Sequence, residues 1–389
     1  MKKGDELTGL HVDDGAIEAD NDEGMERHMR PFKDVKWSLL EGEFLGEFYE
    51  VTYTPELREV FVHQLPYSKE LLKQSGLDKS NRTKTPSMPG KFLSKSQSPT
   101  TKSDFEHLES LGLDKATYRS QTMGASWLAQ NTLQGLKQQV GAVAKFMNNP
   151  GEEHFQALKH LLRYINFDQP VGITYLWRKG DPTDLHLVAD TDAAGASCPD
   201  TMCSIRAFAA FVNLVPISVF AKYGKQTDSS INTSETMAVR EAILDHASFP
   251  CEDTIGAAAM TSRDIVWLRG VIAFIEGKAQ NAYPPTPVRT DNSGTLAVIN
   301  GLHSHKTGKH TLHLVHELRG RKLDGTISPM WVATEKNRAN CLTKQEHGPE
   351  SEKQLLHFQA RKGQGPIHAP GAQRLSRDEV SLPFNPLNG

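Results

Sequence analysis

The chain has 389 residues, of which 38% are hydrophobic and 23% are charged, and its formal net charge is -3. This is the composition of an ordinary globular protein, and the length predicts two or three domains. The near-neutral charge argues against a strongly basic nucleic-acid-binding protein. The longest apolar run, 207–221, is interrupted by Asn213 and Pro216 and is shorter than the roughly 20 residues of a membrane-spanning helix.

The four cysteines and the N-terminus indicate an intracellular protein. Cys198 and Cys203 have no second pair of cysteines or histidines at zinc spacing, so we expect free thiols in a reducing compartment, cytoplasmic or nuclear. The first ten residues contain lysines without an apolar segment behind them, and we therefore expect no secretory signal.

The first half of the chain predicts a hairpin, a linker and then helices. Two short apolar stretches flank Asp13-Asp14-Gly15, a typical hairpin turn. Residues 76–115 are rich in Ser, Lys, Pro and Thr and predict a basic, flexible linker. Residues 116–168 contain apolar residues at helical spacing, in one helix behind a Thr132 cap and in a second helix that follows Pro150. The apolar positions of these two helices, which we expect to form a core, are Leu133, Leu136, Val140, Val143 and Phe146, then Phe155, Leu158, Leu162 and Ile165.

The second half predicts a mixed sheet flanked by helices. The expected strands lie at about 172–178, 185–191, 205–212, 217–222, 288–290 and 327–332. Helices are expected from Glu235, from about Asp264, directly after residue 290, over the basic segment 307–322, and after residue 332. Strands interleaved with helices in this way favour an α/β fold. The Gly- and Pro-rich residues after about 360 are expected to be disordered.

Acidic residues occur at the ends of these elements. Asp190 and Asp192 alternate with apolar residues and therefore share one face of their strand. Asp291 follows a short β-branched strand, and Glu235 lies in the first turn of a helix that Thr233 or Ser234 can cap. Oxygen ligands from two strand ends and one helix start suit a hard divalent cation.

The ordered words VADTDAAG, PISVFAKYGKQ, INTSETMAV, IVWLRGVIAF, VRTDNSGTLAVI, HKTGKH and WVATEKNRANCLTK resemble the ribonuclease H domain of copia-type LTR retrotransposon Pol polyproteins. The resemblance spans about 171–345. It implies a ribonuclease H-like fold and places the four catalytic positions at Asp190, Glu235, Asp291 and Asn340, the last of which is not a carboxylate. About 17 residues are inserted after Glu235, and Glu241 is the alternative for that position.

The earlier part resembles the end of a copia-type reverse transcriptase, from the palm hairpin toward the thumb. Asp13 and Asp14 match the x-V-D-D hairpin, and the segments KWSLLEGEFLGEF, HQLPYSKELL (Gln64 and Tyr67) and YRSQTMGASWLAQNT follow in the family order. The resemblance implies a partial reverse transcriptase (1–75), the linker (76–115), a helical connection (116–168), a ribonuclease H-like domain (169–348), and a terminal helix with a tail (349–389).

Before the ribonuclease H-like domain, two departures from the family pattern affect the expected activity. The family's third polymerase carboxylate lies upstream of the hairpin and has no counterpart here, so we expect no polymerase activity. Asn131-Thr132-Leu133-Gln134-Gly135 stands where the family writes N-T-R-P-D, so partner contacts that use that Arg and Asp are not expected.

The resemblance implies hydrolysis of the RNA strand of an RNA–DNA hybrid with two Mg2+ (or Mn2+) ions. Asp190 would bridge both ions, and Glu235 and Asp291 would complete the metal site. Lys306, Lys309 and His310 are candidates for phosphate contacts, and the absent N-terminal polymerase portion is a candidate partner. Because Asn340 removes one charge, we expect weak cleavage that Mn2+ supports better than Mg2+. On this alignment Asn340→Asp should raise cleavage by at least ~10-fold.

Two other classes of function stay open. One is a catalytically dead remnant that at most binds nucleic acid, and the other is a structural or interaction protein adopted by the host. The completeness of the carboxylate set discriminates between the enzyme and the remnant.

Overall fold

A computed structural model describes most of the chain. The described residues are 41–223 except 182, 183 and 196, then 264–301, 312–344 and 353–363, together with the strands 2–3, 6–11 and 14–18 and residues 23, 25 and 27. Among the helices in these ranges we find none with the length and apolarity needed to cross a membrane.

The N-terminal segment forms a three-stranded antiparallel sheet. Its strands are β1 (Lys2–Lys3), β2 (Glu6–His11) and β3 (Asp14–Glu18), in the order β1-β2-β3. The expected hairpin is confirmed. His11 pairs with Asp14, so Asp14 and Gly15 belong to β3 and not to the turn that the Asp13-Asp14-Gly15 pattern predicts.

A four-stranded antiparallel sheet combines strands that lie far apart in the sequence. Its order is β4 (Gly42–Phe44), β5 (Glu47–Tyr53), β6 (Leu57–His63) and β7 (Gly172–Arg178). Gly172 pairs with His63, and a Cβ atom at Gly172 would lie only 1.9 Å from the carbonyl oxygen of Val62. The absence of a side chain therefore allows β7 to join β6 at its first residue.

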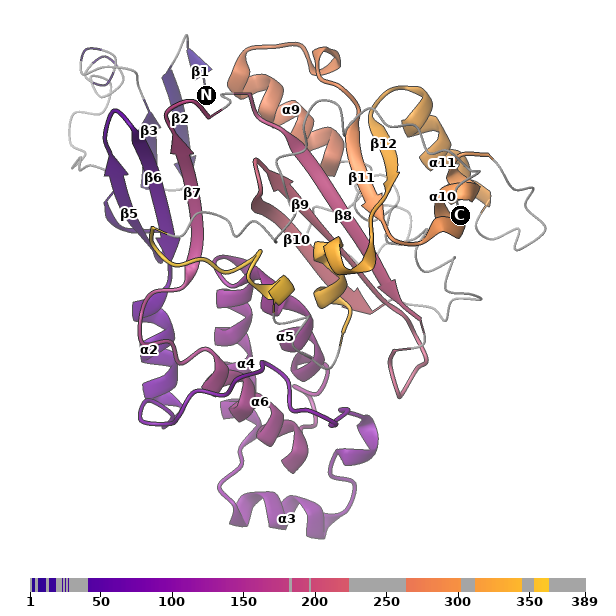
Figure 1. The fold of residues 1–389 in the computed structure, drawn as a ribbon. Coiled ribbons are helices and arrows are strands. Elements are labelled where there is room, and N and C mark those ends of the chain that lie inside the picture. Colours follow the sequence, from indigo (N-terminus) through magenta and orange to yellow (C-terminus); the bar gives the residue numbers. More distant parts are fainter. Residues whose placement is uncertain are drawn as a thin grey trace.

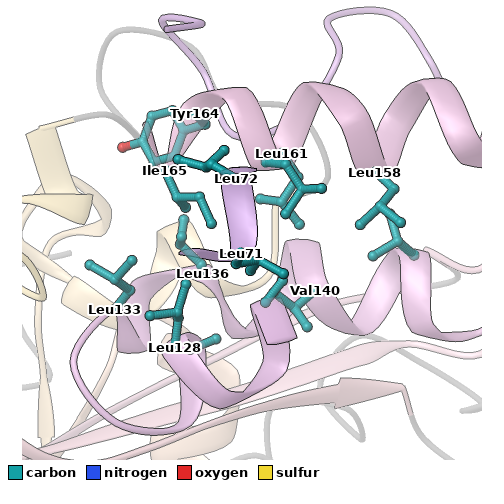
Figure 2. Close-up of a cluster of buried hydrophobic side chains, with 14 of the residues drawn as sticks. Leu71, Leu72, Leu128, Leu133, Leu136, Val140, Leu158, Leu161, Tyr164 and Ile165 are labelled. Carbon is teal, nitrogen blue, oxygen red and sulfur yellow. The ribbon is translucent and has the colours of Figure 1, made fainter. Parts of the chain in front are cut away.

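Five helices lie between β6 and β7 in the sequence, and residues from four of them, all except the second, form one apolar core (Figures 1 and 2). They are α2 (Leu65–Gln74), α3 (Lys102–Ser110), α4 (Lys115–Gln130), α5 (Lys137–Ala144) and α6 (Glu152–Tyr164), with 3-10 turns at Lys95–Gln97 and Gln134–Leu136. All the apolar positions that helical spacing predicts as core are buried. Thr132 is not the expected helix cap, because its hydroxyl donates to Gln64 Oε1 at 2.9 Å.

The segment 76–115 packs against the helices and carries α3, which the sequence analysis does not predict. Arg82 donates to the carbonyl oxygen of Tyr164 at 2.8 Å and lies over the rings of Tyr164 and Phe167. His160 and Thr83 add hydrogen bonds between this segment and α6. These contacts differ from the exposed connector that the polar composition predicts.

A five-stranded mixed sheet forms the second half of the molecule (Figure 1). Its strands are β8 (Leu187–Ala194), β9 (Ile205–Val212), β10 (Val215–Tyr223), β11 (Thr286–Thr290) and β12 (Ile327–Trp331). The order is β10-β9-β8-β11-β12, in which β8, β9 and β10 pair antiparallel while β8, β11 and β12 run parallel. The expected mixed α/β fold, a sheet flanked by helices, is confirmed. The strand expected in it at 172–178 is instead β7 of the four-stranded sheet, where it pairs with β6.

Helices cover one face of this sheet, and a 3-10 helix together with a second short segment packs on the other. The helices are α9 (Asp264–Glu276), α10 (Ser293–Ile299) and α11 (Leu312–Leu323). Their apolar residues pack on the face that carries Leu187, Ala189 and Val288. The opposite face, with Phe211, meets the 3-10 helix Arg338–Leu342 and the segment 353–363.

Candidate functional site

Two predicted acids of β8 lie on the face that the 3-10 helix covers. Asp190 and Asp192 pair with Ala209 and Ala207 of β9, which belong to the apolar cluster of that face. On the other side, Asp190 lies opposite Arg289 of β11 in parallel register. Asp291 follows β11 two residues after Arg289, and this places it at the level of Asp192. The structure therefore brings Asp190, Asp192 and Asp291 together at adjoining strands.

Asp190 is fully buried and bound by two arginines. Its Oδ1 accepts from Arg289 Nε at 2.6 Å, and its Oδ2 accepts from Arg289 Nη2 at 2.8 Å and from Arg338 Nε at 2.6 Å. The backbone N–H of Arg338 also donates to Oδ2, at 3.2 Å. Although burial opposes ionisation, the two guanidinium groups hold the pKa of this carboxyl well below its usual range.

Arg338 reaches Asp190 through an apolar environment. Its guanidinium lies 3.4 Å from the centre of the Phe211 ring, and its side chain is 8% exposed. His357 lies close to the same charges, and burial together with Arg338 lowers its pKa to about 4. His357 is therefore neutral at neutral pH, and the positive charge of this region comes from the arginines.

Asp192 and Asp291 form a second acidic group. Burial, and then the charge of Asp291, raises the pKa of Asp192 to about 6. The Thr343 hydroxyl donates to Asp192 Oδ2, and the charge of Lys344 also favours the ionised form. Two carboxylates that repel each other inside a protein are stabilised by a cation, so this pair fits a divalent ion.

Asn337 contacts Asp291 and the backbone directly before Asp192. It is fully buried, and its Nδ2 donates to the carbonyl oxygen of Thr191 at 2.9 Å and to Asp291 Oδ1 at 3.4 Å. Its Oδ1 accepts from the backbone N–H of Ala339, which caps the 3-10 helix. The sequence analysis missed Asn337 and both arginines. An Asn directly before a helical turn is a cap signal, but no local pattern indicates its contact with Asp291.

Asn340 stands on the 3-10 helix, and its side chain makes its hydrogen bond with another segment. Its Nδ2 donates to Gln354 Oε1 at 3.3 Å, while its Oδ1 is buried without a hydrogen-bond partner among the described residues. Gln354 in turn donates to the carbonyl oxygens of Thr334 and Glu335. The role of Asn340 as a metal ligand stays a prediction.

Several predicted residues lie outside the described part of the chain. These are Asp13, Glu235, Glu241, Lys306, Lys309 and His310. Asp14 begins β3, and only its backbone is described. Within the described residues, no group of three or more His, Cys, Asp or Glu side chains is placed to hold a metal ion. The fit to a cation there rests on the Asp192 and Asp291 pair, since Asp190 is already neutralised.

The fold and this acidic pair define a mixed α/β protein with a candidate divalent-cation site at adjoining strands.

Curated relatives over much of the chain are retrovirus-related Pol polyproteins, and the expected kinship with copia-type Pol polyproteins is thereby confirmed. The polyprotein of transposon RE2 from Arabidopsis thaliana is 24% identical over 335 residues, or 86% of this chain and 20% of the relative. That of transposon RE1 from the same plant is 26% identical over 231 residues, or 59% of this chain and 14% of the relative. That of transposon TNT 1-94 from Nicotiana tabacum is 24% identical over 288 residues, or 74% and 19%.

The chain thus spans about a fifth or less of the length of these relatives. No family model matches it. Among solved structures it is similar to the N-terminal RNase H domain of a Mycobacterium tuberculosis protein, with 12% identity and a TM-score of 0.27 over 41% of this chain and 91% of that one. It is also similar to an RNase H1 isolated from compost, with 14% identity and a TM-score of 0.27 over 40% and 91%. A further structure of such an RNase H1, in complex with an RNA/DNA hybrid, has a TM-score of 0.26 and 14% identity over 40% and 92%.

Proposed function

We propose that the five-stranded domain is a ribonuclease H-type domain that hydrolyses the RNA strand of RNA–DNA hybrids, with activity limited by an incomplete acidic site. The observation that carries this proposal is the proximity of the buried Asp192 to the half-buried Asp291 at adjoining parallel strands. The kinship with retrotransposon Pol polyproteins supports it.

The proposed ligands differ in one position from those implied by motif order. Asp192 and Asp291 would hold a Mg2+ or Mn2+ ion, with Glu235 as a further ligand. A metal bound there would supply Lewis-acid stabilisation of the negative charge that develops during phosphodiester hydrolysis. Asp190, the motif position, is saturated by Arg289 and Arg338 and acts as a positioning residue. Asn337 would fix the orientation of the Asp291 carboxylate.

Substrate recognition would use the shape of the hybrid and the 2'-hydroxyls of its RNA strand. Lys306, Lys309 and His310 are the proposed phosphate contacts. The polymerase part of a Pol polyprotein is the proposed partner, because Asp13 and Asp14 alone do not complete a polymerase site. We accordingly propose that this chain extends no primer.

A second candidate function is binding of nucleic acid without cleavage. The observation that favours it is the neutralised Asp190, which leaves two acids at the site within the described residues. The two candidates differ in a single measurable property, the hydrolysis of the hybrid.

The test uses the full chain, because segment 353–363 packs on the five-stranded sheet. A hybrid with a labelled RNA strand is incubated with Mg2+, Mn2+ or EDTA, next to an RNA duplex of the same sequence. We expect slow cleavage of the hybrid alone, faster with Mn2+ and absent in EDTA. Asp291→Asn should abolish cleavage, while Asp184→Asn, a change at an exposed ion pair with Lys278, should not. Binding of the hybrid without cleavage in either metal would favour the second candidate.

A further inference from the structure

The contacts around Asp190 indicate how the acidic centre of this domain is assembled, which goes beyond the proposed activity. We propose that Arg289 and Arg338 are permanent counter-charges of Asp190, so that the centre forms without a metal ion on Asp190 and takes a single divalent cation, on Asp192 and Asp291. This inference rests on the proposed function only in taking the acidic pair as a cation site.

The first argument is the saturation of the Asp190 carboxylate. An ionised carboxylate offers about four lone-pair positions. Asp190 receives four N–H donors, of which one reaches Oδ1 and three reach Oδ2. Oδ2 is therefore saturated, and a metal ion on this carboxylate would have to share Oδ1 with Arg289 beside two guanidinium charges.

The second argument is the burial of the three charges. The Asp190 side chain is 0% exposed, that of Arg338 is 8% exposed, and that of Arg289 is 17% exposed. Arg338 also lies against the Phe211 ring, at 3.4 Å from its centre. If a metal ion replaced Arg338 on Asp190, a guanidinium charge would remain buried without a partner, which is strongly unfavourable.

The third argument is the balance of charge. Asp190 and its two arginines together carry one net positive charge, and Lys344 adds another near Asp192. These positive charges face the two negative charges of Asp192 and Asp291, and Glu235, the proposed further ligand, would add a third. One dication would bring the net charge of these groups to +1, while a second would bring it to +3.

The cluster also explains how the acidic pair is held. Asp190 ties β8 to β11 through Arg289 and to the 3-10 helix through Arg338. Asn337 and Thr343, which flank that 3-10 helix, contact Asp291 and Asp192. Asp190 therefore positions the groups that orient the cation site, and its role is separable from metal binding.

The experiment measures Mn2+ binding to the full chain without nucleic acid, by calorimetry and by electron paramagnetic resonance. We expect one Mn2+ per chain, and Asp192→Asn or Asp291→Asn should weaken binding by at least about 10-fold. Asp190→Asn should lower the melting temperature in EDTA by about 10 °C, because it leaves two arginines unpaired. Its Mn2+ affinity should stay within about 3-fold of the original, since Asp190 is not a ligand.

A second variant keeps the test decisive if Asp190→Asn does not fold. Arg338→Met preserves the apolar contact with Phe211 but uncovers Asp190, so it should melt lower in EDTA and regain part of the loss with Mn2+. In the double variant Asp190→Asn with Arg338→Met, both partners are removed, and it should melt higher than either single variant. The matched control is Lys179→Met, which removes a cation from the exposed pair with Glu56 and should change neither property.

Two results would overturn the inference. One is binding of two Mn2+ ions to the unchanged chain, and the other is loss of Mn2+ affinity in folded Asp190→Asn as large as that in Asp291→Asn. Failure of the proposed function is a different result, namely one bound Mn2+ that responds to Asp192 and Asp291 but no cleavage of the hybrid.

Discussion

Asp192 shows how burial changes the behaviour of a single carboxyl group in this molecule. It is 4% exposed and lies beside Asp291, and its pKa is raised to about 6. An unfolded Asp has a pKa of about 3.9. Its protonated form is therefore favoured by folding. This contribution to stability is complete below about pH 4 and is lost as the pH rises through about 6.

The first prediction follows from the raised pKa of Asp192, which makes its ionisation cost stability at neutral pH. Asp192→Asn imitates the protonated form, so in EDTA at pH 7.5 it should be more stable than the original chain by about 3 kcal/mol. At pH 4 the two proteins should melt together. Thermal unfolding at the two pH values measures the difference. Equal melting temperatures at pH 7.5 would mean that Asp192 ionises without cost in the folded chain.

A second prediction concerns Asn340, whose motif position alone favours a large gain from a carboxylate. In the structure its side chain binds Gln354 and makes no hydrogen bond with Asp192 or Asp291. We therefore expect Asn340→Asp to raise single-turnover cleavage of the hybrid by less than about 3-fold, well short of the 10-fold that corresponds to about 1.4 kcal/mol of barrier. A gain of 10-fold or more would show that residue 340 turns toward the acidic pair when metal is present.

At the residue scale, the sequence predicts what is periodic and misses what depends on distant partners. Alternation along β8 places Asp190 and Asp192 on one face, as the structure shows. The contact of Asp190 with Arg338 joins residues 148 positions apart. Both arginines lie within the words VRTDNSGTLAVI and WVATEKNRANCLTK, but nothing local in those words shows that Arg289 and Arg338 meet Asp190.

At the element scale, the strands of the second half follow closely from apolar periodicity. The expected strands at 172–178 and 205–212 have those bounds in the structure, and the others differ by one to three residues at their ends. Helix α3 was missed because it has one buried residue, Leu108, and therefore almost no apolar stripe. The expected helix after residue 332 is a short 3-10 helix, held by the Asn337 cap and by contacts with the sheet.

The third prediction tests the junction of β6 and β7. Gly172→Ala should lower stability by at least about 3 kcal/mol, because its Cβ atom would meet the Val62 carbonyl at 1.9 Å and backbone would have to move. Gly141→Ala in α5 is the control. Nothing lies within 4 Å of its Cβ position, so this change should stabilise the helix by about 0.5–1 kcal/mol. Denaturant unfolding measures both, and equal effects would contradict the packing at Gly172.

At the scale of the whole molecule, segment 353–363 connects the two larger sheets. Leu355 and Phe358 pack on the five-stranded sheet, and Ala360 forms a β-bridge with Gly172 of the four-stranded sheet. Lys362 then pairs with Glu50 at 2.7 Å, and the backbone N–H of Gly363 donates to Glu59. Segment 353–363 lies beyond the proposed boundary between residues 348 and 349 but packs on both larger sheets, so this boundary does not mark a separate unit.

The fourth prediction tests this connection. Phe358 is 1% exposed, and Phe358→Ala should cost about 3–5 kcal/mol. Leu356→Ala, two positions away at a side chain that is 43% exposed, should change stability by less than about 0.5 kcal/mol. Comparison of the two variants by thermal unfolding checks the assignment. Similar losses in both would mean that the segment is not anchored by Phe358.

The same segment sets a condition on the order in which the protein can be completed during synthesis. Glu50 meets Lys362, which is 312 residues further along the chain. A ribosome that adds about 5–20 residues per second needs at least about 15 seconds between these two residues. During that interval β5 and β6 are already outside the ribosome without their final partner, and contacts of such long range form slowly. Translation rate and chaperone occupancy across this interval should therefore affect the yield of folded chain.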